Sequence, residues 1–249
     1  MSRSLWPREH GAYAQLLAPL ITALVEQPPT LAAGLLAIAA CCAFLANEPL
    51  LVVLGHRGKR LREQAGRRAT WRLALLVIIA IGAGAAGFVL APSALRAAAL
   101  VAPVALVTIA LAFRRGEHSL VGELVAAIAL SGGALPVAIA SGATLHRAIA
   151  LWAAWGVGFA CSVIAVHRVI ARNRRAASWR DGIAALACAG VIGAAIAVFS
   201  YERLAMCAIP LAALSLVLVA RPPRATHLRK IGVALVVAAL ATSVLGVSL

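Results

Sequence analysis

Acidic residues are scarce in this sequence, and so are aromatic residues. Only eight Asp and Glu residues occur among 249, aromatic residues make up 5%, and charged residues of both signs make up 12%. A soluble globular domain carries about 25% charged residues, so the composition argues against a soluble protein. Hydrophobic residues make up 63% of the chain. They form runs that approach or exceed the roughly 18 residues of a membrane-spanning helix.

Long apolar runs restrict the fold to a few choices. In lipid the backbone must satisfy its own hydrogen bonds, and the short alternating segments of a barrel are missing here. We therefore expect an all-α polytopic membrane protein with about nine transmembrane helices, organised as a single domain over residues 1–249. The expected spans cover residues 11–25, 30–54, 73–90, 95–113, 120–140, 148–166, 183–199, 204–220 and 231–249.

Motifs for metal or redox chemistry are also missing. The five cysteines lie in apolar runs and form no CxxC pair, which predicts small apolar core residues. The sequence has no HExxH motif and no close pair of histidines. We therefore expect no metal site built from histidine.

Basic residues are unevenly distributed between the two sides of the expected spans. Of the 23 Lys and Arg residues, only Arg96, Arg147 and Arg203 fall on one side. The positive-inside rule places the other side in the cytoplasm. We expect a bacterial inner-membrane protein with a cytoplasmic N-terminus and a periplasmic or extracellular C-terminus. The net charge of +15 then indicates contact with membrane lipids, and not with nucleic acid, because no aromatic residues alternate with the arginines.

Asn47 and Glu48 interrupt the second apolar run about two turns before its basic end. Ionisable residues at such depth are costly and usually face the interior of the bundle. Pro49 beside them favours a kink. The functional interpretation is a polar pocket containing both side chains. The structural alternative is a Glu48 that is protonated, or paired with a nearby arginine, and fixes helix packing.

Further polar residues occur at the same ends of the spans. Glu123 resembles Glu48 but lies nearer the interface. The histidines are explained as ordinary interfacial residues, except His10 and His56, which lie within dense polar groups. Most arginines are topology signals, but those beside buried polar groups can hold phosphate bidentately. Arg8, His10, Asn47, Glu48 and the Arg114–Arg115 pair are expected to converge on one cytoplasm-facing cavity. The predicted ligand-binding residues are Arg8, His10, Asn47, Glu48, His56, Arg60, Arg114, Arg115, Arg168 and Arg172, with Glu48 as the candidate catalytic residue.

Three segments resemble the YwiC-like family of bacterial membrane proteins. They read PREHGAYAQLLAPL at residues 7–20, ANEPLLVVLGHRGKRLR at 46–62 and FRRGEHSLVGELVAAIALSGGALPVA at 113–138. This resemblance implies a membrane protein and no defined biochemical role.

A second resemblance is to the UbiA superfamily of intramembrane prenyltransferases, which have nine helices and a cytoplasmic N-terminus. Asn47-Glu48 matches the opening of their first Asp-rich motif, and Arg114-Arg115 stands where they carry a Lys/Arg pair. Their second Asp-rich motif corresponds to residues 167–172, which contain no carboxylate. The resemblance implies a UbiA-like bundle. Because Mg²⁺ needs several oxygen ligands, these departures predict no tight Mg²⁺ site.

These observations leave three functions open. The first is binding of an isoprenoid, quinone-type or phosphorylated lipid at the cytoplasm-facing cavity. That protein could also be a divergent prenyltransferase without the Asp-rich motifs, in which Glu48 recruits a metal or acts as a base. The second is a small transporter or permease component, although the chain shows no internal repeat of the two-half kind. The third is a non-enzymatic membrane assembly subunit.

Overall fold

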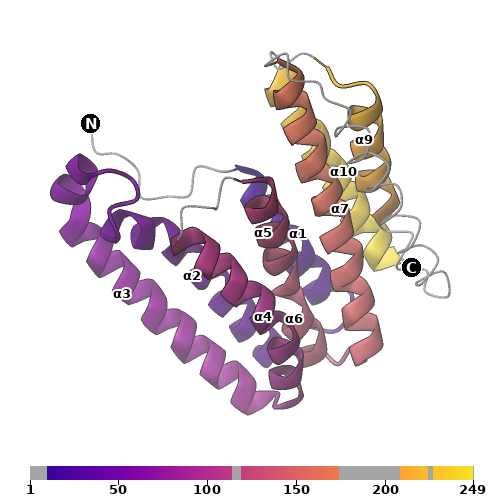
Figure 1. The fold of residues 1–249 in the computed structure, drawn as a ribbon. Coiled ribbons are helices and arrows are strands. Elements are labelled where there is room, and N and C mark those ends of the chain that lie inside the picture. The colour runs from indigo at the N-terminus through magenta and orange to yellow at the C-terminus, as the bar shows by residue number, and fades with distance from the viewer. Residues whose placement is uncertain (1–9, 114–118, 174–207, 224–226, 249) are drawn as a thin grey trace.

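The computed structural model describes residues 10–113, 119–173, 208–223 and 227–248, and these contain helices and no strand. The helices are α1 (His10–Val25), α2 (Leu31–Val53), α3 (Lys59–Leu90), α4 (Ser93–Phe113), α5 (Leu120–Gly132), α6 (Ala134–Ala140), α7 (Leu145–Asn173), α9 (Ile209–Ala220) and α10 (Leu228–Ser248). They form the bundle shown in Figure 1, in which α3 lies along one outer edge and α7, α9 and α10 group at the other side.

Five of the described segments are long and apolar enough to cross a membrane. They are Leu31–Val53, Lys59–Leu90, Ser93–Leu111, Leu120–Ala140 and Leu145–Ile170. Shorter apolar helices cover Gly11–Val25, Ile209–Ala220 and Lys230–Val244. The expected all-α polytopic membrane fold is confirmed. The expected span at residues 183–199 lies outside the described residues, so the count of nine spans stays a prediction.

The third helix begins earlier than the sequence predicts. The apolar run alone places its start at residue 73, whereas α3 begins at Lys59 and is 32 residues long. The basic segment before the apolar run is rich in Lys, Arg, Glu, Gln and Ala, which are strong helix formers. Helical propensity therefore extends α3 beyond its apolar part.

The fifth expected span is divided into α5 and α6 at Gly133. Pro136, just after the break, has no backbone N–H to donate to the helix. Just before the break, the indole Nε1–H of Trp152 donates to the carbonyl of Ile128, 2.9 Å away. Gly132 allows close packing here, because a Cβ at this position would lie 2.6 Å from Cγ1 of Val101. The break is thus packed between α4 and α7.

The core of the bundle contains residues from α1, α2, α4, α5, α6, α7, α9 and α10. Many of its members are alanines, which let helix backbones approach closely where lipid removes the hydrophobic drive for association. Trp155 and Phe159 on α7 stack with ring centroids 5.3 Å apart. Trp155 is 1% exposed, so α7 provides the largest buried side chain of the core.

The bundle has two polar ends. At one end α2, α4 and α7 finish and α3 and α5 begin, and we call this the basic end. The opposite end is called the far end. At the far end Thr30 accepts a hydrogen bond from the Ala33 backbone and donates to the carbonyl of Ala140, 2.8 Å away. An ion pair between Glu26 and Arg147 joins the end of α1 to the start of α7 there. These contacts join two chain reversals, the one between α1 and α2 and the one between α6 and α7.

Candidate functional site

Glu48 is buried at the basic end of α2 and is held by Arg57. It is 4% exposed. Nε of Arg57 donates to Oε1 of Glu48 at 3.0 Å, and Nη2 donates to Oε2 at 2.7 Å. The geometry is a bidentate guanidinium–carboxylate pair, which is stronger and more directional than a single ion pair. Both oxygens of the carboxylate are therefore engaged.

The turn after α2 brings Arg57 back to Glu48. Gly55 has φ of 78° and Gly58 has φ of 98°, both in the left-handed region that glycine tolerates. The backbone N–H of His56 donates to the carbonyl of Leu51, which folds the turn against the end of α2. Arg57 can therefore point inward along α2 and meet a residue nine positions earlier in the chain.

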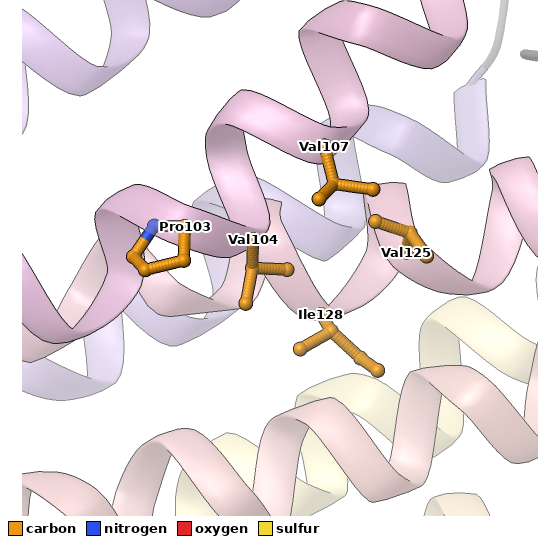
Figure 2. Close-up of a pocket in the computed structure, with 5 residues that line it drawn as sticks. All are labelled: Pro103, Val104, Val107, Val125 and Ile128. Atoms are coloured by element: carbon orange, nitrogen blue, oxygen red, sulfur yellow. The ribbon is translucent and has the colours of Figure 1, made fainter.

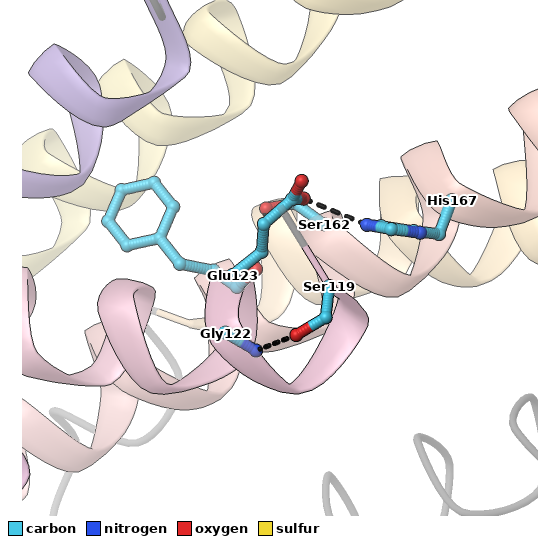
Figure 3. Close-up of polar contacts among 6 residues, drawn as sticks. Ser119, Gly122, Glu123, Ser162 and His167 are labelled. Atoms are coloured by element: carbon cyan, nitrogen blue, oxygen red, sulfur yellow. Dashed lines mark hydrogen bonds and ion pairs between the residues drawn. The ribbon is translucent and has the colours of Figure 1, made fainter. Parts of the chain in front are cut away.

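A second acid–base pair joins α5 to α7 at the same end. Oε2 of Glu123 lies 2.9 Å from Nε2 of His167, and Figure 3 shows the two side chains pointing toward each other from the two helices. Ser119 caps α5 by accepting the N–H of Gly122 at 3.0 Å, which places Glu123 in the first turn of the helix. A carboxylate there also interacts favourably with the helix dipole.

Arg168, the next residue along α7, is in a different situation. Its Nε and Nη1 atoms are buried, and they have no hydrogen-bond partner in the described part of the chain. Ala165 and Val169, three positions before it and one after it, are fully buried in an apolar cluster with α9 and α10. Arg168 itself is half-buried, and buried guanidinium nitrogens are costly unless an acceptor such as an anion reaches them. Nδ1 of His56 is buried without a partner in the same way.

Two predicted site residues are exposed in the described structure, Asn47 and Arg60. Asn47 is exposed in the described structure, whereas the neighbouring Glu48 is buried. Arg60 is exposed on the first turn of α3. The expectation that Asn47 and Glu48 line one pocket together stays a prediction.

The remaining predicted residues fall at or beyond the limits of the described structure. His10 begins α1 and Arg172 lies in the last turn of α7, with backbone positions only. Arg8, Arg114 and Arg115 lie outside the described residues. Their convergence with Glu48 on one cavity stays a prediction.

The groove that the structure shows between α4 and α5 is apolar. It has a volume of about 340 Å³ and is lined by Pro103, Val104, Val107, Val125 and Ile128 (Figure 2). It is not the polar cavity expected from the sequence. Within the described residues, no group of three or more His, Cys, Asp or Glu side chains is placed to hold a metal ion.

Comparison with known proteins places the chain in one family. The YwiC-like protein family matches residues 6–138, just over half of the 249 residues. This stretch contains the Glu48–Arg57 pair and Glu123, but not His167 or Arg168. No curated protein matches the chain, and no solved structure matches it either. The UbiA-like bundle implied by the sequence therefore stays a prediction. The chain belongs to the YwiC-like protein family.

Proposed function

We propose that this membrane protein binds the anionic headgroup of a lipid at the basic end of its bundle, with Arg168 as the principal contact. Of the lipid classes considered, a phosphorylated lipid such as an isoprenyl phosphate fits this site, because a quinone headgroup is neutral. The observation that carries the proposal is the pair of buried Arg168 nitrogens without a partner among the described residues. The apolar bundle around the site supports a ligand that arrives from the membrane.

The nearby described acids do not neutralise Arg168. Glu48 is bound through both oxygens by Arg57, and Glu123 is bound by His167. A phosphate or an acidic headgroup supplies the missing acceptor oxygens, and guanidinium binds such groups with charge-assisted bonds. Arg172 lies one helical turn further along α7.

The pairing of Glu48 argues for a structural role. Glu48 could act as a base or metal ligand only if Arg57 released its carboxylate oxygens, which would leave a buried charge without its partner. We therefore assign Glu48 and Arg57 to fixing the turn that begins α3, and we base no prenyl-transfer reaction on Glu48. The proposed activity is lipid binding.

The charge distribution supports an orientation for this site. The spans expected from the sequence put 20 of the 23 basic residues on the side to which the basic end belongs, and the positive-inside rule assigns that side to the cytoplasm. We propose an inner-membrane location with the site open to the cytoplasmic leaflet and the N-terminus in the cytoplasm.

A second candidate is proton-coupled transport, favoured by the Glu123–His167 pair. Two titratable groups in contact between transmembrane helices are typical of proton relays. In proteoliposomes carrying a pH gradient, transport predicts proton flux that Glu123→Gln abolishes. Equal flux in empty and protein-containing vesicles contradicts this candidate.

Mass spectrometry of lipids that co-purify with the protein tests lipid binding. We expect the native protein to retain one class of anionic lipid above its share in the membrane, and we expect Arg168→Gln to lose it. Lys230→Gln is the matched control, because it removes an exposed cation near the start of α10. Retained lipid of bulk membrane composition in all three proteins contradicts the proposal.

A further inference from the structure

The first part of α3 extends beyond the membrane. Its uncharged apolar stretch runs from Leu73 to Leu90, about 27 Å of helix, which matches a hydrocarbon core of about 30 Å. Residues 59–72 continue the same helix outward from the basic end. They contain six Lys and Arg residues and one acid, Glu63. This extension is therefore a rigid cationic segment next to the lipid surface.

One face of α3 is exposed from Arg60 to Ile78 in the described structure. Arg60, Arg67, Trp71 and Ile78 are separated by seven, four and seven positions, a spacing that places them on one helical face. Trp71 is 71% exposed and Ile78 is 68% exposed. Ala69 is fully buried and lies two positions from both Arg67 and Trp71, on the opposite face. The outer face thus changes from basic to aromatic to apolar toward the membrane.

The heights of these residues match the layers of a lipid leaflet. An exposed Trp beside an apolar run typically marks the boundary between headgroups and hydrocarbon. Arg67 and Arg68 lie about 6 and 4.5 Å outward of Trp71 along the helix, within a headgroup layer of about 5–8 Å. Both arginines are exposed. Neither forms an ion pair within the described part of the chain.

We propose that the outer face of α3, formed by Arg67, Arg68 and Trp71, binds the headgroups of anionic phospholipids. The site is separate from Arg168, because α3 packs mainly on α2 at the outer edge of the bundle, whereas Arg168 lies on α7 (Figure 1). It recruits lipids around the protein and depends neither on a ligand inside the bundle nor on which leaflet the basic end faces.

Quenching of Trp71 fluorescence by brominated lipids tests this proposal. The full chain is reconstituted into phosphatidylcholine vesicles that contain either brominated phosphatidylglycerol or brominated phosphatidylcholine, and the signal lost in Trp71→Phe isolates Trp71 among the five tryptophans. We expect stronger quenching by the anionic lipid. Each basic residue near an anionic surface contributes about five-fold in affinity at moderate salt, so Arg67→Gln/Arg68→Gln should reduce the preference by up to about thirty-fold.

Matched variants distinguish headgroup binding from a role in membrane insertion alone. Arg67→Lys/Arg68→Lys should keep most of the preference because the charge remains, and Arg96→Gln at the far end should keep all of it. At 1 M salt the Debye length falls to about 3 Å, and the preference should weaken. Equal quenching by the two lipids in the native protein overturns the proposal. An unchanged preference in Arg67→Gln/Arg68→Gln overturns it as well.

Discussion

Arg57 holds both carboxylate oxygens of Glu48, with distances of 3.0 and 2.7 Å, although the two residues are only nine positions apart across the end of α2. The pair closes the turn between α2 and α3 over a carboxylate that is 4% exposed. A costly buried charge is thereby neutralised by a neighbour in the chain.

Arg57→Gln should destabilise the protein by about 3 kcal/mol, because it leaves Glu48 buried without a cation. This value is near the lower end of the range for broken buried pairs, since the Arg57 side chain is 29% exposed. The double variant Glu48→Gln/Arg57→Gln should recover part of the loss. Thermal unfolding in detergent measures both, with Arg60→Gln as the exposed control. Equal stability of Arg57→Gln and Arg60→Gln would show that the pair contributes little.

Close packing of α2 on α3 depends on Gly87. A Cβ at this position would lie 2.8 Å from Cγ of Leu36 and 3.3 Å from the carbonyl oxygen of Ala32. Gly87→Ala should therefore cost about 1–3 kcal/mol through overpacking. Gly82→Ala, in the same helix with open space around it, should be neutral or slightly stabilising. Equal changes in melting temperature for Gly87→Ala and Gly82→Ala would contradict this packing.

The orientation can be tested by labelling single cysteines in intact cells. In a background without the five native cysteines, Gln64→Cys on the extension of α3 should be protected from an impermeant thiol reagent. Ser93→Cys at the far end should react. Labelling of Gln64→Cys with protection of Ser93→Cys reverses the orientation and places the Arg168 site in the opposite leaflet.

Hydropathy was sufficient to predict the membrane class and most span positions, because the bilayer fixes the length of an apolar helix. It misplaced the start of α3, since the polar helix before Leu73 contributes no apolar signal. The depth of Glu48 indicated a buried carboxylate, which agrees with its 4% exposure. Pairing with a nearby arginine was the structural alternative for Glu48, but which arginine it would be was not predicted, because that depends on the direction of the turn through Gly55 and Gly58.

Contacts between distant segments were beyond reach of the sequence. Glu123 and His167 are 44 positions apart, and their pairing depends on how α5 packs against α7. Arg168 was a candidate because it lies among polar residues at a span end, but its buried, unpartnered nitrogens follow from the packing of α7 with α9 and α10. The adjacent residues His167 and Arg168 therefore differ in their surroundings, since one has a partner and the other has buried nitrogens without one in the described part of the chain.

The most direct test of lipid-headgroup binding compares an isoprenyl monophosphate with the corresponding neutral isoprenol, measured by thermophoresis on the purified protein. A charged hydrogen-bonding partner for Arg168 should favour the phosphate by about 10- to 100-fold. Arg168→Gln should remove this difference, Arg168→Lys should keep part of it, and Lys230→Gln should leave it unchanged. Equal affinity for the phosphate and the alcohol in the native protein, or a preference that survives in Arg168→Gln, would contradict the proposed site.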